Sequence, residues 1–373
     1  MNNDILFHMK DPETLEGEEK KRWTAVFVVM IVLFSVCCLE FLNLRYDSLA
    51  RYPYKDENSR KLIRQYLTQE EIEYIIEYSI PPNMFIAYIQ EDGFSIYHAA
   101  EYKELSQSQW DKSPSDIVRM VEETRNIMSV AELASYLQEN NYKYDDVSRW
   151  IRMESEQGIE LIPYAMNTDA YLNRQRSVSS RVPNVHELPE DIPSGSTSRI
   201  DISDDLQVPL RSLCSGISSA MNSARACAGL QISRGYVSYS DQEFAHQAAE
   251  KEHGTDASYY MLPGGHDEHQ LGLAVDFVID GLDPAYFERT PQAKWLRENA
   301  WRYGLVQTRT EADTSITEHV AEDWHYRYVG TDLARTLHES ELSFARYKAQ
   351  VIATSNPEPG ETSEPETSQA PKN

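Results

Sequence analysis

The longest apolar run of the chain lies near its N-terminus. Between Trp23 and Leu44 the only charged residue is Glu40, close to the far end of the run. A helix rises about 1.5 Å per residue, so this run is long enough to cross the roughly 30 Å of hydrocarbon in a bilayer, with Glu40 able to reach the interface. The pattern therefore predicts one membrane-spanning helix over residues 23–44.

The charges beside this run predict its orientation. Lys20, Lys21 and Arg22 precede it directly, and basic residues on one side of a single span favour the cytoplasm. We therefore expect a cytoplasmic tail over residues 1–22 and an extracellular location for the chain after the span. A cleaved signal peptide is the alternative, but no small-residue cleavage site follows the two cysteines at 37–38, which favours an uncleaved anchor.

Helical periodicity follows over residues 45–165. Thr68 is a candidate helix N-cap with Glu71 three residues later, and Ser129 with Glu132 repeats this capping box. Similar apolar spacing follows each box. This likeness indicates either a duplicated helical unit or the general frequency of capping boxes in helical proteins. No catalytic constellation occurs here, so we expect a helical extracellular region that serves as a spacer or an interaction module.

Two segments are polar and rich in turn-forming residues. Residues 166–205 are dominated by Ser, Pro, Arg and acidic side chains, which is typical of a linker. Residues 351–373 are rich in Pro, Glu, Ser and Thr and are expected to be a disordered tail. The segment between them, residues 206–350, is therefore the expected catalytic domain.

The pattern over residues 206–350 predicts an α+β fold. Helices are expected at about 206–228 and 291–303, packed on a small antiparallel sheet. If residues 211–228 form one helix, Cys214 and Cys227 lie about 20 Å apart and cannot form a disulfide. Neither cysteine belongs to a C-x-x-C motif, which argues against a thiolate metal site or a redox pair.

One strand-like run carries a charge in its middle. Asp276 interrupts the alternating apolar stretch 273–279, and a lone carboxylate there is costly unless it is neutralised, paired or bound to a cation. His269 precedes it across a turn that contains Gly272, and His325 lies between aromatic residues in a second strand-like run. Two imidazoles and one carboxylate suit zinc with a vacant fourth position.

Glu322 completes this candidate site. It lies three residues before His325, where it could accept a proton from the attacking water without binding the metal. The alternative for the three candidate ligands is an ordinary hydrogen-bonded polar core. His266 and His319 are expected to be solvated loop histidines, and Arg327 is expected to be a structural ion-pair partner.

Overall composition narrows the class of partner. The formal net charge is -25, which argues against nucleic acid because phosphate binding needs clustered Lys and Arg. The hydrophobic content of 41% is sufficient for a sizeable core.

Two stretches of this chain resemble the paired motifs of a known family. Residues 267–276 read D-E-H-Q-L-G-L-A-V-D, and residues 322–330 read E-D-W-H-Y-R-Y-V-G. They are similar to S-x-H-x-x-G-x-A-x-D and E-P-W-H-x-R-Y-V-G of the zinc-dependent D-alanyl-D-alanine carboxypeptidases of the vancomycin-resistance (VanY) type, with their L,D-carboxypeptidase relatives. The resemblance covers roughly residues 206–347. Asp267 stands where serine is usual, and Asp323 stands where proline is usual.

The resemblance implies a role for each residue of the candidate site. His269, Asp276 and His325 would be ligands of Zn²⁺, and Glu322 would be the catalytic base. The implied activity is a zinc metallopeptidase that removes the terminal D-amino acid from peptidoglycan stem peptides at the cell wall. The implied fold is the small antiparallel sheet with packed helices, here carrying the zinc site behind an N-terminal transmembrane helix.

A third stretch bears on substrate binding. Residues 234–242 read R-G-Y-V-S-Y-S-D-Q, where the family has S-G-Y-R-S-x-x-x-Q and its arginine holds the substrate's terminal carboxylate beside the glutamine. Gln242 and Ser238 match this pattern, Val237 occupies the arginine position, and Arg234 is a possible surrogate. The resemblance thus implies Gln242, Arg234 and Ser238 as substrate-binding residues.

The missing arginine leaves other functions open. A peptidoglycan endopeptidase of the same fold would present no terminal carboxylate at that point, so Val237 would suit it. A wall-binding protein that keeps the fold and metal without turnover is the non-enzyme alternative.

Overall fold

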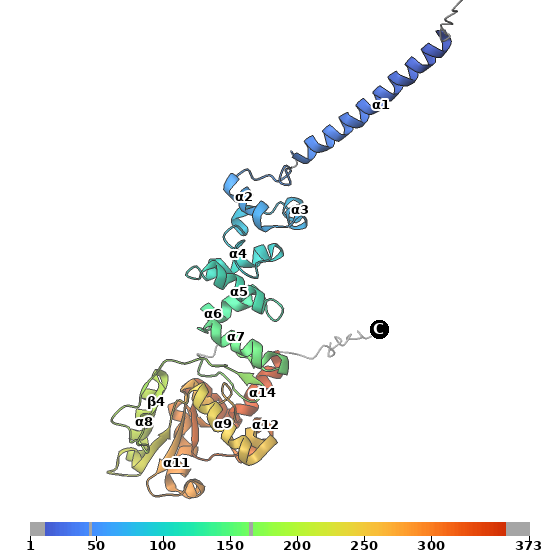
Figure 1. Cartoon of the computed structure of the whole chain (residues 1–373). Coiled ribbons are helices and arrows are strands. Elements are labelled where there is room, and N and C mark those ends of the chain that lie inside the picture. Colours follow the sequence, from blue (N-terminus) through green and yellow to red (C-terminus); the bar gives the residue numbers. More distant parts are fainter. Residues whose placement is uncertain (1–11, 45–46, 164–166, 356–373) are drawn as a thin grey trace, which may run out of the picture. The chain divides into compact units, whose positions relative to one another are not determined.

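The computed structural model describes residues 12–44, 47–163 and 167–355. Its first element is α1 (Pro12–Leu44), a single long helix (Figure 1). Within α1, Lys20–Leu39 has a mean hydropathy of 2.2 and none of this stretch is buried. A helix of the predicted length and apolar character is therefore present. By these criteria it fits a membrane span or a signal sequence, and the predicted tail over residues 1–22 lies partly outside the described residues.

The chain after α1 divides into two compact units, the first of which includes residues 47–103 and 112–118. Its elements are α2 (Glu57–Tyr66), α3 (Gln69–Glu77), η1 (Pro82–Met84) and η2 (Ile96–His98). Tyr52, Ile75 and Phe85 are among its fully buried core residues. The predicted capping box is confirmed, because Thr68 Oγ1 accepts from the backbone N–H of Glu71 and the Glu71 carboxylate accepts from the backbone N–H of Thr68.

The second unit contains residues 104–111 and the described chain from Arg119 onward. The residues of α4 (Ala99–Ser108) and α5 (Pro114–Thr124) are divided between the two units, and α6 (Val130–Gln138), α7 (Tyr144–Met153) and η3 (Ser155–Gln157) belong to the second. Ser129 caps α6 as predicted, since its hydroxyl accepts from the backbone N–H of Glu132 at 3.2 Å.

The centre of this unit is a four-stranded antiparallel sheet in the order β5-β6-β8-β7. Its strands are β5 (Leu230–Arg234), β6 (Ala274–Ile279), β7 (Leu305–Gln307) and β8 (His325–Tyr328). The helical segments around it are α8 (Asp204–Ala220), η4 (Ala226–Gly229), α9 (Tyr239–His253), η5 (Gly254–Asp256), α10 (Ala257–Tyr260), η6 (Glu268–Leu271), η7 (Pro284–Arg289), α11 (Pro291–Asn299), η8 (Ala300–Tyr303), η9 (Glu311–Asp313), α12 (Thr314–Thr317), α13 (Thr331–Ser340) and α14 (Phe344–Ser355). The small antiparallel sheet with packed helices is confirmed.

The alternation of side chains separates the two faces of this sheet. Val275 and Phe277 of β6 and Tyr326 of β8 pack in one apolar core with α8 and α11. Asp276 lies between Val275 and Phe277, and His325 directly precedes Tyr326, so both point to the opposite face. The two residues are directly paired in the register of β6 and β8. The sheet thus places both polar groups side by side.

The segment predicted as a linker, residues 166–205, is built into this unit. Strand β1 (Glu160–Leu161) pairs in parallel with β2 (Arg176–Ser177), and β3 (Val185–Glu187) pairs antiparallel with β4 (Asp201–Ser203). Ile192, Ile200 and Ile202 are buried in the same core as β6. A few isolated apolar residues anchor a segment whose composition is mostly polar.

The expectation about the cysteines was wrong. Cys214 and Cys227 form a disulfide, with their Cα atoms 4.0 Å apart. The prediction assumed one continuous helix, but α8 ends at Ala220 and the chain reverses through Asn222, which has a φ of 47°. This turn returns Cys227 to the side of α8, where both cysteines are buried.

Candidate metal centre

His269, Asp276 and His325 converge on one point. His269 lies on η6, Asp276 on β6 and His325 at the start of β8, and one potential ligand atom from each lies within 4.8 Å of the others. All three side chains are buried. The structure therefore brings together the three residues that the sequence selected as ligands.

Hydrogen bonds fix which nitrogen of each imidazole faces the centre. His269 Nδ1 lies 2.7 Å from the carbonyl oxygen of Gly235, and His325 Nε2 lies 3.0 Å from Glu268 Oε2. Each of these outer nitrogens thus has an oxygen within hydrogen-bond distance that can accept its proton. The inner nitrogens, His269 Nε2 and His325 Nδ1, lie 3.3 and 2.9 Å from the two carboxylate oxygens of Asp276.

This arrangement fits a metal ion. His269 Nε2 is buried and has no hydrogen-bond partner, which is costly for a polar atom unless a ligand satisfies it. Metal-binding histidines characteristically donate their outer N–H to a carboxylate or a carbonyl, as both rings do here. Two imidazole nitrogens and a carboxylate form a donor set that suits zinc.

The electrostatics keep the carboxylate of Asp276 ionised. Burial alone would raise its pKa, but the adjacent imidazoles of His269 and His325 outweigh burial and hold the pKa well below its usual range. Asp276 therefore presents a charged oxygen at neutral pH, as a metal ligand must.

Glu322 lies beside these residues, in the loop that leads into β8. Its side chain is 18% exposed and forms an ion pair with Arg309. Burial would raise the pKa of Glu322, but the Arg309 guanidinium outweighs burial and lowers it, with a smaller contribution from His325. Glu322 is therefore an ionised carboxylate next to the cluster, the state that a proton acceptor requires.

Sequence reasoning missed Glu268, whose carboxylate contacts the ring nitrogen of His325 that faces away from the cluster. Its carboxylate accepts from His325 Nε2, from Thr308 Oγ1 at 2.5 Å and from Arg327 Nη1 at 2.8 Å. The role of Arg327 as a structural ion-pair partner is thereby confirmed. The signal available in the sequence was the pair of consecutive acids, Asp267 and Glu268, directly before the proposed ligand His269. In the structure both acids are buried.

Two of the three candidate substrate-binding residues contact each other. Arg234 Nη2 donates to Gln242 Oε1 at 2.8 Å, and Gln242 Nε2 lies 3.3 Å from Asp267 Oδ2. Ser238 instead caps α9, where its hydroxyl contacts both the backbone N–H and the carboxylate of Asp241. Val237 is tied to the cluster through its backbone N–H, which donates to the carbonyl of His269 at 3.3 Å.

His266 and His319 are not solvated, contrary to expectation. Both are buried, and their Nδ1 atoms lie 2.7 and 2.8 Å from the carbonyl oxygens of Asn173 and Val320. Burial lowers the pKa of His266, and burial together with Arg309 lowers the pKa of His319 to about 4. Among the described residues, neither belongs to a group of three potential metal ligands.

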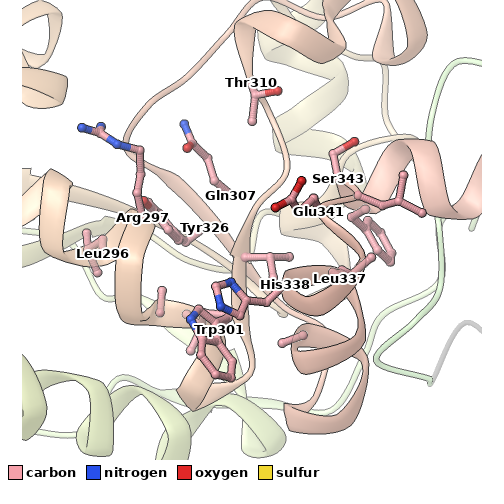
Figure 2. A pocket seen from close by; sticks show the side chains of 16 residues that line it. Leu296, Arg297, Trp301, Gln307, Thr310, Tyr326, Leu337, His338, Glu341 and Ser343 are labelled. Atoms are coloured by element: carbon pink, nitrogen blue, oxygen red, sulfur yellow. The ribbon is translucent and has the colours of Figure 1, made fainter.

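A separate pocket of about 450 Å³ lies along the edge strand β7, all three residues of which line it. Trp301, Tyr326 and His338 line it, with Arg297 and Gln307 near Tyr326 (Figure 2). Tyr326 and His325 are consecutive residues of β8 and so point to opposite faces. This pocket is therefore distinct from the metal centre, and none of His269, Asp276 and His325 lines it.

Comparison with known proteins agrees with the geometry of the site. Residues 214–331 match the family model described as VanY: D-alanyl-D-alanine carboxypeptidase. This segment is a VanY-family domain. It contains the three clustered residues and Glu322.

The relatives cover this domain alone. A D-alanyl-D-alanine carboxypeptidase of Enterococcus faecium is 34% identical over 116 residues, which are 31% of this chain and 35% of that protein. A D-alanyl-D-alanine carboxypeptidase of Enterococcus faecalis is 37% identical over 92 residues, 25% of this chain and 33% of that protein. The chain thus spans about a third of the length of these curated relatives. The solved structure of the LdcB LD-carboxypeptidase aligns with 52% of this chain and 90% of its own, with a TM-score of 0.47 and 24% identity.

Proposed function

We propose that this protein is a membrane-anchored zinc D-alanyl-D-alanine carboxypeptidase that trims peptidoglycan stem peptides outside the cell. The observation that carries the proposal is the buried convergence of His269, Asp276 and His325 within a VanY-family domain. The orphaned nitrogen of His269 supports a metal at this point. The curated relatives that share this domain are D-alanyl-D-alanine carboxypeptidases.

Each residue near the centre has a separate task in this mechanism. His269 Nε2, an Asp276 oxygen and His325 Nδ1 would hold the zinc, which when bound supplies Lewis acidity and makes water easier to deprotonate. Glu322 accepts the proton of the attacking water and later returns it to the leaving amine. Glu268 holds His325 in the required tautomer through its Nε2–H. No side chain attacks the peptide, so no acyl-enzyme forms.

Arg234 is our candidate for the group that binds the substrate's terminal carboxylate. Its hydrogen bond goes to the neutral amide of Gln242, and its charge also acts on the buried carboxylate of Asp267. Gln242 also contacts Asp267, two residues before the ligand His269. Arg234 is therefore connected through Gln242 to the segment that carries His269, close enough to the centre to bind the terminal carboxylate of a substrate. A planar, two-pronged donor suits such a group.

An endopeptidase is the second candidate function. Val237 stands at the usual arginine position. Loss of this arginine makes the pocket less favourable to a free carboxylate and suits a substrate whose chain continues. A wall-binding protein without turnover would keep the same geometry.

The anchor and the extracellular location rest on two observations. The stretch Lys20–Leu39 of α1 has the length and hydropathy of a membrane span, and the basic residues at its amino end favour the cytoplasm. The disulfide between Cys214 and Cys227 suits an oxidising compartment. The catalytic domain would therefore face the cell wall.

One experiment separates these functions and also distinguishes D,D- from L,D-carboxypeptidase activity. The zinc-loaded full-length protein is incubated with a pentapeptide stem that ends in D-Ala-D-Ala, a tetrapeptide stem and a cross-linked dimer, and the fragments are identified by mass. Release of D-alanine from the pentapeptide supports the proposal. Release from the tetrapeptide indicates L,D-carboxypeptidase activity, cleavage of the dimer indicates an endopeptidase, and binding without any fragment indicates a wall-binding protein.

A further inference from the structure

Arg309 forms a bridge between two carboxylates beside the metal centre. It lies between β7 and η9, and its side chain is only 6% exposed. Nη2 donates to Asp267 Oδ2 at 2.8 Å, and Nη1 donates to Glu322 Oε2. The backbone N–H of Glu322 also donates to the carbonyl of Arg309 at 2.9 Å. Arg309 thus holds Glu322 at both its side chain and its backbone.

Asp267 fixes the other end of this bridge. It is buried, and its Oδ1 accepts from the backbone N–H of His269 at 2.9 Å. Gln242 Nε2 lies 3.3 Å from its Oδ2, the oxygen that also binds Arg309. A continuous set of hydrogen bonds therefore runs from the backbone of a proposed ligand through Asp267 and Arg309 to the proposed base.

The charges around Arg309 explain why the bridge needs Asp267. Besides Asp267 and Glu322, the carboxylates of Glu268 and Asp276 act on the guanidinium at longer range, and His319, which also faces it, is neutral at pH 7. The planar guanidinium has donors on both sides, so it can bind two carboxylates in fixed directions. The serine that is usual at position 267 carries no charge and would leave Glu322 as the nearest charged partner of Arg309.

We infer that Asp267 and Arg309 are positioning residues for Glu322: their ion pair sets the direction in which the Glu322 carboxylate points. The inference rests on the proposed function. It assigns a purpose to the departure from the family motif at position 267, which neither the ligand set nor the substrate-binding residues explain.

The test compares Asp267→Asn and Arg309→Lys with Arg346→Gln in the full-length, zinc-loaded protein. Arg346 is a matched control because its Nε also binds a buried aspartate, Asp313, at 2.9 Å, and we assign it no part in the site. Zinc content and the thermal midpoint are measured first. We expect Asp267→Asn to keep its zinc and lose about 10- to 100-fold in kcat, as a misplaced catalytic group does. Its KM should change less than kcat, because Asp267 forms a hydrogen bond with only one of the proposed substrate-binding residues, Gln242.

Arg309→Lys should lose at least as much kcat, because a lysine ammonium cannot span both carboxylates in fixed directions. Arg346→Gln should lower stability alone. Wild-type kcat in folded, zinc-loaded Asp267→Asn and Arg309→Lys would overturn the inference. The double variant Asp267→Asn with Arg309→Gln removes both charges. If its thermal midpoint returns to the wild-type value while its kcat stays low, the ion pair positions Glu322 in addition to any role in folding. Recovery of kcat as well would contradict positioning.

A structural measurement keeps this test separate from that of the proposed function. If the wild type cleaves none of the stem peptides, the proposed function fails, and the inference is then decided by crystal structures of zinc-loaded wild type and Asp267→Asn. Rotation or loss of order of the Glu322 carboxylate in the variant supports positioning. An unchanged Glu322 in both structures contradicts it.

Discussion

Glu268→Gln should weaken zinc binding although Glu268 is not a proposed ligand. The substitution keeps the shape of the side chain but removes its charge. The carboxylate accepts hydrogen bonds from His325, Thr308 and Arg327, and the side chains of His325 and Arg327 are fully buried. A neutral amide cannot replace a carboxylate as a partner for the buried guanidinium.

The structure allows the size of the effect to be estimated. Breaking a buried ion pair by removing one partner costs about 3–5 kcal/mol of folding free energy. Loss of the carboxylate behind a metal-binding histidine weakens metal affinity by about 10- to 100-fold. We expect both effects, because Glu268 holds Arg327 with one oxygen and His325 with the other.

The stability difference should also depend on pH. Burial would raise the pKa of Glu268, but Arg327 and His325 outweigh burial and hold it well below its usual range. A lowered folded-state pKa means that the stabilisation is present above the unfolded value of about 4.3 and is lost as pH falls further. The stability gap between the wild type and Glu268→Gln should therefore be widest near neutral pH and should narrow below about pH 4.

The assay pairs zinc competition against a chromophoric chelator with urea unfolding of the metal-free protein. Glu318→Gln is the matched control, since Glu318 forms a solvent-exposed ion pair with Arg174 at 3.2 Å, and such pairs contribute about 0–1 kcal/mol. If Glu268→Gln binds zinc as tightly as the control variant and unfolds at the same urea concentration, the supporting role of Glu268 is refuted.

Three further predictions follow from the remaining features. Replacing Cys214 and Cys227 by serine should lower the free energy of unfolding by about 3 kcal/mol, because the bridge closes a short loop; an unchanged urea midpoint would show that the bridge does not form in the folded protein. Arg234→Ala should raise KM for a substrate with a free carboxylate, with a loss on the order of 2–5 kcal/mol, and Val237→Arg should improve cleavage; if neither change alters turnover, the endopeptidase gains support. Protease added to intact cells should digest the catalytic domain, and protection until lysis would contradict the proposed topology.

The sequence predicted the polar position in β6 because its determinants are local. An alternating run with a charge at Asp276 predicts a strand with one polar face, and β6 has this form. The pairing of Asp276 with His325 then follows once the two strands are neighbours. The same locality explains the cap at Thr68, whose partner lies within one helical turn.

The parts that sequence reasoning missed depend on distant contacts. Arg309 meets Asp267 across 42 positions of the chain, and no periodic pattern links them. The disulfide was missed because the turn at Asn222 breaks a helical pattern that the apolar residues alone would continue. The strands within residues 167–205 were missed because isolated apolar residues such as Ile202 supply their anchor.

The central claim is that Glu322 is the base of a zinc peptidase. The most direct measurement pairs zinc content with the rate of D-alanine release on the same purified samples of wild type, Glu322→Gln and His269→Ala. The account predicts that Glu322→Gln retains a full equivalent of zinc and loses turnover, and that His269→Ala loses both. A Glu322→Gln protein with full zinc and near wild-type turnover would contradict it.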